Sequence, residues 1–339
     1  MQTFTAAKRE FLPRLAVGEI FGRITTELQL VESEYERQAD SNIQVISYLS
    51  DYLRASGGKR VRPALLILSV YAAGGNGRSE SAIRLATVME MLHTATLVHD
   101  DIIDNAGLRR NRESVNARFG NQTAVLMGDW LYMTAFESSL KERSLAILDI
   151  LTRLTRKMTE GELIQLTMLG DADISEDEYF DILRRKTAYL FSGCCEIGAI
   201  LGGVGPKEQT ALREYGMDLG IAFQLADDLL DFTSEESILG KASGADLLEG
   251  KITLPLLLLQ KSEPSVKSML IDVMYDGNYA DGTRRTLLEK LELHGILENV
   301  RERARAYANR ARKNLELLPE TEYSLALDAI PGYVIDRTS

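Results

Sequence analysis

Two acidic clusters of identical spacing are the residues in this sequence best suited to chemistry. The first comprises Asp100, Asp101 and Asp104, and the second comprises Asp227, Asp228 and Asp231. Aspartates four positions apart share one face of a helix, and like charges at that spacing destabilise it unless a cation offsets them. Carboxylates are hard oxygen ligands of the kind Mg²⁺ binds while keeping water and phosphate oxygens in its shell. Because both clusters lie in apolar sequence, we expect two facing carboxylate walls around a metal–diphosphate cluster.

Basic residues suited to phosphate binding surround the first cluster. Arg109 and Arg110 follow it closely, and guanidinium groups bind phosphate through paired hydrogen bonds. The segment GGKRVRP, residues 57–63, places Lys59 and Arg62 after two glycines. Such a turn at a helix start presents backbone N–H groups and cations to an anion. We therefore expect a diphosphate near these residues.

Further candidates lie along the helices. They are His93, two turns before Asp100 on the same side, Gln165 in GELIQL, Lys186 with Thr187, and the lysines Lys241 and Lys251, each preceded by glycine. A polar group on an apolar helix face must find a partner, which places Gln165 toward a cavity. Lysines close to a carboxylate wall are natural partners of a diphosphate.

Apolar residues recur at helical spacing through most of the chain, and strand patterns are nearly absent. Helices are predicted within 12–55 and over 63–73, 79–104, 116–137 and 144–169, with another starting at 175–178 and peripheral helices over 262–326. The 339 residues are 45% hydrophobic and show no Pro/Gly/Ser-rich linker. The sequence predicts an all-α fold with a single domain over 1–339, its first 40 or so residues forming a peripheral helix.

Composition excludes several classes of function. The net charge of −11 and the lack of a basic stripe argue against a nucleic-acid partner. Cys194 and Cys195 are adjacent, which fits buried small residues rather than a disulfide framework or metal site. The N-terminus has no secretory pattern, and no stretch is apolar for 18 residues. We expect a cytoplasmic protein without a transmembrane segment.

These motifs together resemble the trans-prenyl (polyprenyl) diphosphate synthase family, and the resemblance runs from about Ser41 to the C-terminus. GGKRVRP is similar to the family's GGKxxRP, and LVHDDIIDNAGLRR is similar to its first aspartate-rich motif with an arginine pair. FQLADDLLDF followed by LGKASGADLLEGKITLP resembles the second motif and its lysine-bearing tail. The resemblance implies the isoprenoid synthase fold, a single large helical bundle around a central active-site cavity.

The resemblance also implies roles for individual residues. Asp100, Asp104 and Asp227, supported by Asp101, Asp228 and Asp231, would bind three Mg²⁺ ions on an allylic diphosphate. Arg109, Lys186, Lys241 and Lys251 would hold the same diphosphate. Lys59, Arg62, His93 and Arg110 would hold isopentenyl diphosphate. Thr187 and Gln224 would line the reacting pocket, so that Lys186, Thr187 and Gln224 serve the catalytic step.

The sequence departs from the family after the first motif. The usual RRGxP is here Arg110, Asn111, Arg112 and Glu113, so both the glycine and the proline are missing. This departure leaves the detail of the loop open, but not the arginine pair.

Chain length is expected to depend on residues upstream of the first aspartate. In the family the residues four and five positions before it form the floor of the product tunnel, and here these are the small Thr96 and Ala95. Leu92 and Val88 would come next on the same side of the helix. The resemblance therefore implies a long-chain product of roughly seven to ten isoprene units, as in quinone side chains.

The expected activity is head-to-tail, 1'-4, elongation of farnesyl or geranylgeranyl diphosphate with isopentenyl diphosphate, by a homodimer with loose membrane contact. The alternatives are a short-chain farnesyl or geranylgeranyl diphosphate synthase, and the large catalytic subunit of a heteromeric synthase. A terpene cyclase would carry an Asn/Ser/Glu triad in place of Asp227–Asp231. A cation-binding scaffold would have no use for Lys59, Arg62, Arg109 and Arg110.

Overall fold

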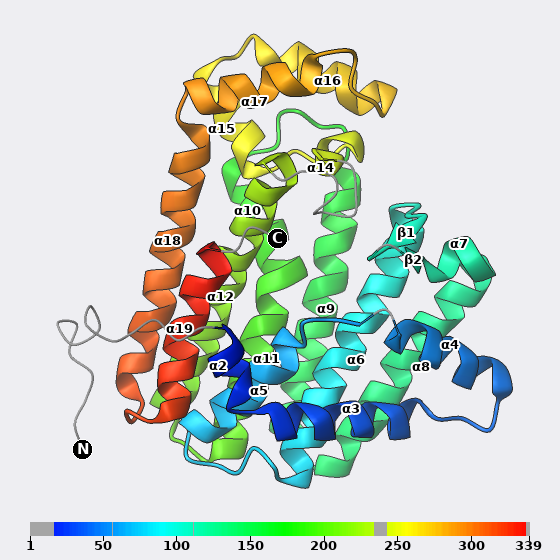
Figure 1. The fold of residues 1–339 in the computed structure, drawn as a ribbon, viewed down its shortest axis with the longest axis vertical. Coiled ribbons are helices and arrows are strands. Elements are labelled where there is room, and N and C mark those ends of the chain that lie inside the picture. The colour runs from blue at the N-terminus through cyan, green and yellow to red at the C-terminus, as the bar shows by residue number, and fades with distance from the viewer. Residues whose placement is uncertain (1–16, 56, 111, 234–242, 337–339) are drawn as a thin grey trace. The chain divides into compact units, whose positions relative to one another are not determined.

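The structure, a computed structural model, describes residues 17–55, 57–110, 112–233 and 243–336 (Figure 1). In these residues the regular secondary structure is helical apart from one antiparallel pair of two-residue strands. The all-α fold predicted from the spacing of apolar residues is therefore confirmed.

The chain divides into two compact units. The first contains Met1–Thr155, Leu190–Gly216 and Asn314–Ile330, and the second contains Arg156–Tyr189, Met217–Lys313 and Pro331–Ser339. The single domain, the central cavity and the facing of the two acidic clusters stay predictions.

The first unit is built around one long helix. Its elements are α2 (Val17–Gly22), α3 (Thr25–Ala39), α4 (Gln44–Arg54), α5 (Val61–Ala72), α6 (Glu80–Ile103), β1 (Leu108–Arg109), β2 (Arg112–Glu113), α7 (Val115–Phe119), α8 (Asn121–Ser139), η1 (Leu140–Glu142), η3 (Leu315–Leu317), most of α11 (Tyr189–Gly202) and α19 (Glu322–Asp336), and the first parts of α9 (Leu145–Thr167) and α12 (Pro206–Thr233). Helix α6 packs against α3, α5 and α8 and is buried along most of its length. It is the core helix of the unit, which explains why its sequence is apolar around the whole circumference.

Local sequence accounts for the ends of α6. The Ser79 hydroxyl accepts a hydrogen bond from the Ala82 N–H at 3.2 Å, and Glu80 lies in the first turn. Both features stabilise the positive end of the helix dipole. The helix ends at Ile103 with Asp104 as its C-cap, so the first acidic cluster occupies its last turn.

The helix predicted over 116–137 is wrong in one respect, because it is interrupted near its start. Gly120 has a φ of +85° and separates α7 from α8. A residue without Cβ adopts this backbone conformation without steric cost. The short α7 thereby leaves the line of α8 and follows the β1–β2 hairpin.

The second unit consists of α10 (Glu176–Leu183), η2 (Arg184–Ala188), α14 (Ala245–Leu248), α15 (Leu254–Ser262), α16 (Val266–Asp276), α17 (Thr283–Leu293), α18 (Ile296–Asn314) and the remaining parts of α9 and α12. The predicted helix start at 175–178 is confirmed, since Ser175 and Glu178 form a capping box. The apolar core joins α10, α12, α15, α16, α17 and α18. Phe232 and Leu225 of α12 lie inside it, so the helix that carries the second acidic cluster is held rigidly by packing.

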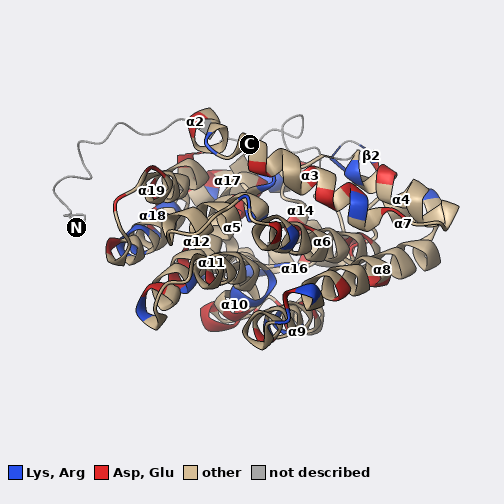
Figure 2. Cartoon of the chain, turned by 90° about the horizontal axis from the view of Figure 1, so that it is seen from below, with Lys and Arg blue, Asp and Glu red and all other residues tan. Residues whose placement is uncertain are grey.

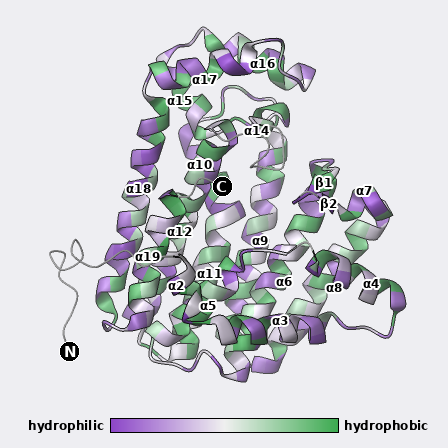
Figure 3. Ribbon diagram, in the orientation of Figure 1, coloured by the Kyte–Doolittle hydropathy of each residue, from purple (hydrophilic) through white to green (hydrophobic). Residues whose placement is uncertain are grey.

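Surface and interior are separated along single helices. In α18 the buried residues Ile296, Val300, Ala304 and Ala308 recur every four positions, while acidic and basic residues intersperse over the other faces (Figures 2 and 3). Cys194 and Cys195 are buried thiols, as expected. Within the described part of the chain, no helix has both the length and the apolar character needed to cross a membrane.

Candidate active site

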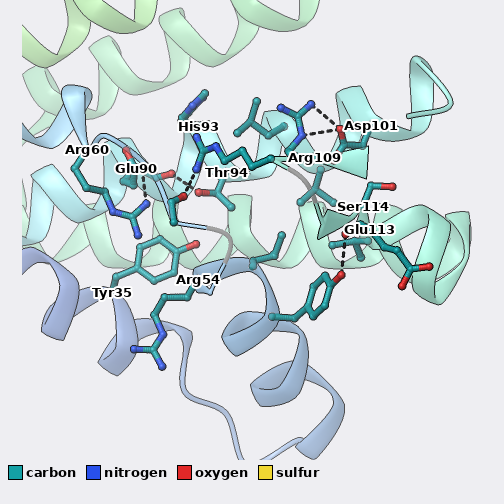
Figure 4. A pocket seen from close by; sticks show the side chains of 17 residues that line it. Tyr35, Arg54, Arg60, Glu90, His93, Thr94, Asp101, Arg109, Glu113 and Ser114 are labelled. Atoms are coloured by element: carbon teal, nitrogen blue, oxygen red, sulfur yellow. Dashed lines mark hydrogen bonds and ion pairs between the residues drawn. The ribbon is translucent and has the colours of Figure 1, made fainter. Parts of the chain in front are cut away.

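The end of α6 and the hairpin form the acidic part of the first unit's site. Asp101 is 3% exposed, and its carboxylate accepts hydrogen bonds from Arg109, with Nε at 2.7 Å and Nη2 at 2.5 Å from Oδ1 (Figure 4). Burial raises the pKa of Asp101, although the Arg109 guanidinium acts against the rise. Asp100 and Asp104 are half-buried one turn apart. The structure therefore uses Asp101 to hold Arg109 and leaves Asp100 and Asp104 nearer to solvent.

The glycine-rich turn before α5 is held by an arginine that the sequence reasoning gave no role. Arg60 has a φ of +49°, and its guanidinium pairs with Glu90 of α6 at 2.7 Å and with Glu32 of α3. Burial lowers the pKa of Arg60, but the two carboxylates outweigh burial and the net shift is upward. A left-handed conformation costs a non-glycine residue about 1 to 3 kcal/mol, and these ion pairs offset it.

Arg110 reaches the same turn from the hairpin. It too has a left-handed backbone, with a φ of +52°, and its guanidinium donates to the Gly57 carbonyl. A Cβ on Gly58 would lie 3.0 Å from Arg110 Nη1, so glycine at this position leaves the guanidinium its place. The structure thus brings the GGK turn and Arg110 together.

His93 lies within this group of cations. Burial lowers its pKa well below the usual value, and Arg62, Arg110, Arg109 and Arg60 lower it further. The imidazole is therefore neutral at pH 7 and offers a hydrogen bond without adding charge. Together Gly57, Arg60, His93, Asp101, Arg109 and Arg110 line one pocket of the first unit (Figure 4). A concave surface with several guanidinium groups and a neutral donor suits a phosphate group.

The remaining residues predicted in this unit lie close to the pocket or deeper along α6. Lys59 is exposed in the turn, and the Arg62 guanidinium lies 5.1 Å from the centre of the Phe191 ring. Val88, Leu92 and Ala95 are fully buried on one side of α6, whereas Thr96 is half-buried and donates its hydroxyl hydrogen bond to the His93 carbonyl at 2.7 Å.

In the second unit, four residues form a chain of hydrogen bonds. Thr187, Gln224 and Asp228 are predicted site residues, and Tyr179 was not predicted. The Thr187 hydroxyl donates to Gln224 Oε1 at 2.9 Å, and Gln224 Nε2 donates to Asp228 Oδ1 at 3.0 Å. The Tyr179 hydroxyl donates to Asp228 Oδ2. Burial, together with Asp246, raises the pKa of Asp228 to about 8, which the Tyr179 and Gln224 hydrogen bonds oppose. The chain orients Asp228 and connects it to Thr187.

Lys186 lies in η2, where the helix widens into one π-helical turn from Arg184 to Ala188. Its ammonium pairs with Glu162 at 2.5 Å and donates a hydrogen bond to Gln165. Single π-helical turns often occur at functional sites because they reorient the side chains that follow. Gln165 therefore lies beside a predicted site residue, and its placement toward a cavity stays a prediction.

The other residues predicted in this unit lie around the end of α12. Asp231 is buried, and its backbone carbonyl accepts hydrogen bonds from Gly244 N–H at 2.7 Å and the Ser243 hydroxyl at 2.9 Å. Asp227 is half-buried. Lys251 pairs with Glu249 at 2.7 Å. Lys241 lies outside the described residues.

The donor sets of the two clusters fit a metal that shares its ligands with a substrate. Each cluster supplies carboxylate oxygens from one turn of helix, and among the described residues no three acidic, histidine or cysteine side chains form a metal cage by themselves. Mg²⁺ commonly binds through one or two carboxylates and keeps the rest of its shell for water and phosphate. The residues present therefore suit Mg²⁺ together with a diphosphate.

Comparison with known proteins identifies the chain. The sequence profile of the polyprenyl synthetase family matches residues 43–291. The chain belongs to the polyprenyl synthetase family. It is 38% identical over 301 residues to the octaprenyl diphosphate synthase of Escherichia coli, covering 88% of this chain and 92% of that protein. It is also 36% identical to the geranylgeranyl diphosphate synthase of Methanosarcina mazei, covering 85% and 88% of the two chains.

A crystal structure of a polyprenyl synthase from Caulobacter crescentus, complexed with calcium and isoprenyl diphosphate, superposes with a TM-score of 0.90 at 33% identity. It covers 97% of this chain and all of that one. The isoprenoid synthase fold is thereby confirmed, and the chain is a prenyltransferase.

The polyprenyl synthase motifs do not indicate which neighbouring residues hold the site residues in place. Glu90 offered a signal, because a carboxylate inside the apolar run LATVMEMLHT needs a buried partner. Its partner Arg60 stands inside a recognised motif, but only the fold shows which arginine turns inward. Tyr179 gave no signal, because nothing in the sequence links it to Asp228 49 positions later.

We expect the Arg60→Met variant to lower the free energy of unfolding by about 3 to 5 kcal/mol, since it leaves Glu90 buried without its cation. Adding Glu90→Gln should restore part of the loss. The matched control is Arg37→Met, whose pair with Glu34 is exposed and should contribute about 1 kcal/mol or less. Urea unfolding at pH 7 measures all three. Equal stability of the Arg60 and Arg37 variants would contradict the assignment.

Proposed function

We propose that this prenyltransferase elongates an allylic diphosphate with isopentenyl diphosphate in an Mg²⁺-dependent, head-to-tail reaction that yields a long-chain all-trans polyprenyl diphosphate. The observation that carries the proposal is the pocket of the first unit, where Arg110 and the GGK turn meet beside His93 and the first acidic cluster. A site rich in guanidinium groups next to carboxylates suits a diphosphate on one side and a metal on the other.

Each substrate diphosphate has its own set of residues. Arg109, Lys186 and Lys251, with Lys241, hold the allylic diphosphate, while Lys59, Arg62, His93 and Arg110 hold isopentenyl diphosphate. Asp100, Asp104 and Asp227, with Asp101, Asp228 and Asp231, hold three Mg²⁺ ions. When bound, Mg²⁺ neutralises charge that develops on the departing diphosphate.

The reaction follows from charge. The allylic C–O bond breaks with both electrons leaving on the diphosphate oxygen, whose charge Arg109 and Lys186 stabilise. The double bond of isopentenyl diphosphate then attacks the allylic carbon, and the new cation loses a proton to the released diphosphate. Thr187 and Gln224, fixed by their hydrogen bond, line the reacting pocket and help exclude water. A protein nucleophile is not needed.

A long product is supported by the small Ala95 on α6 and by the likeness to the octaprenyl diphosphate synthase. Quinone side chains are the proposed use of such a product. The likeness to a geranylgeranyl diphosphate synthase keeps a short-chain enzyme as the alternative. The homodimer, the loose membrane contact and the cytoplasmic location stay predictions, and the large catalytic subunit of a heteromeric synthase stays an alternative.

The decisive experiment is product analysis. Purified protein, Mg²⁺, farnesyl diphosphate and labelled isopentenyl diphosphate are incubated, and the dephosphorylated products are separated by length. We expect a ladder that ends at roughly seven to ten isoprene units, because the floor residues are small near the site. A product of fifteen or twenty carbons would leave a short-chain synthase, and no incorporation in the presence of Mg²⁺ would overturn the proposal.

The chain-length assignment predicts different effects of two substitutions on α6. Ala95→Phe should shorten the main product to a few isoprene units, since the ring fills the space one turn below Asp100. Leu92→Ala should leave the product as long as in the wild type or longer. The same chromatography measures both. Identical product lengths in Ala95→Phe and wild type would show that α6 does not form the floor.

The lowered pKa of His93 predicts how its role depends on pH. A depressed pKa keeps the imidazole neutral as the pH falls to 6, so no cation is gained there. His93→Gln, a neutral donor, should therefore raise the KM for isopentenyl diphosphate by the same small factor at pH 6 and pH 8. If the ratio of variant to wild-type KM grows toward pH 6, His93 binds as a cation and the assignment of its neutral state fails.

A further inference from the structure

A cluster of aromatic and basic side chains joins α4 to the hairpin of the first unit. We call it the aromatic clamp, and it consists of Tyr52 of α4, Arg112 of β2, and Arg118 and Phe119 of α7. The guanidinium carbons of Arg112 and Arg118 lie 4.6 Å and 4.9 Å from the centre of the Tyr52 ring, and the Phe119 ring meets Tyr52 edge-on at 5.3 Å. The Tyr52 hydroxyl donates to the backbone carbonyl of Glu113 at 2.7 Å. The buried ring therefore contacts both strand β2 and the helix that follows it.

The clamp holds the strand that returns from the turn bearing Arg110. Arg109 pairs with Arg112 across the hairpin, and Arg110 directly follows strand β1. Arg110 has a positive φ, and a bulky residue in that conformation is strained. A hairpin of two residues on each strand is too short to be stable alone. Its conformation must therefore be maintained from outside.

The two neighbouring arginines differ in how they are held. Arg109 is anchored directly by its two contacts with the buried Asp101. Arg110 instead reaches the Gly57 carbonyl from the strained turn, so its position depends on where the hairpin lies. Loosening the hairpin should displace Arg110 more than Arg109.

We propose that Tyr52 is a positioning residue for the second substrate, because its clamp on β2 sets the turn that directs Arg110 toward the GGK segment. This chain lacks both the glycine and the proline of the family's RRGxP motif, so no proline ring restricts the backbone after Arg110. This inference rests on the proposed function, in which Arg110 binds isopentenyl diphosphate.

Steady-state kinetics of the full-length protein tests the inference, with isopentenyl diphosphate varied at saturating farnesyl diphosphate and the reverse. Tyr52→Phe removes the hydroxyl that donates to Glu113 but keeps the ring, and should raise the KM for isopentenyl diphosphate about two- to tenfold. Tyr52→Leu also loses both cation–aromatic contacts and should raise it roughly 10- to 100-fold. In both variants the KM for farnesyl diphosphate should stay near the wild-type value, because Arg109 keeps its own anchor.

Tyr48 provides the matched control. It lies one turn earlier on α4, is 52% exposed and meets the same Phe119 ring edge-on at 5.9 Å. Tyr48→Leu should leave both KM values unchanged. If it raises the KM for isopentenyl diphosphate as much as Tyr52→Leu does, general loosening of α4 is the cause and the inference is overturned.

A double-mutant cycle separates positioning from a merely structural role. If Tyr52 acts through Arg110, adding Tyr52→Phe to Arg110→Ala should raise the KM for isopentenyl diphosphate no further. Multiplying effects of the two substitutions would overturn the inference, as would an unchanged KM in Tyr52→Leu. If the wild-type protein incorporates no isopentenyl diphosphate, the proposed function fails, whereas normal wild-type turnover with unaltered Tyr52 variants refutes only the clamp.

Discussion

Compensation of buried charge around α6 is the constraint on which the first unit's site depends. Glu90 and Asp101 are carboxylates in the core helix, and leaving either one buried without its cation would be strongly destabilising. Arg60 and Arg109 compensate them from a turn and a hairpin that lie before and after the helix in sequence. The ion pairs that stabilise these carboxylates also bring the neighbouring basic residues close to α6.

Strain is concentrated at the same place. Arg60 and Arg110 both have left-handed backbones, which non-glycine residues seldom adopt outside turns and functional sites. Each is held by contacts with other elements: Arg60 by two carboxylates, and Arg110 through the hairpin that Tyr52 contacts. The unfavourable backbone conformations persist because several tertiary contacts hold each residue. They place the two guanidinium groups beside the glycine-rich turn.

In the second unit, hydrogen bonds orient a buried carboxylate. Asp228 accepts hydrogen bonds from Tyr179 and Gln224, which oppose the rise in its pKa that burial and Asp246 cause. Gln224 also accepts a hydrogen bond from Thr187, which lies in the π-helical turn beside Lys186. The two units thus present basic and acidic groups in ways that packing, rather than local sequence, controls.

The sequence by itself determined the helical class, the helix that carries the first acidic cluster and the residues of the motifs, because these depend on local spacing and residue type. The 79–104 helix and the capping box at Ser175 are examples in which short-range hydrogen bonds and periodicity suffice. The partners of buried charges were decided only by the tertiary structure. Glu90 demanded a cation, yet which arginine meets it, and that Tyr52 contacts the hairpin 61 residues away, depends on loop geometry and packing between distant segments.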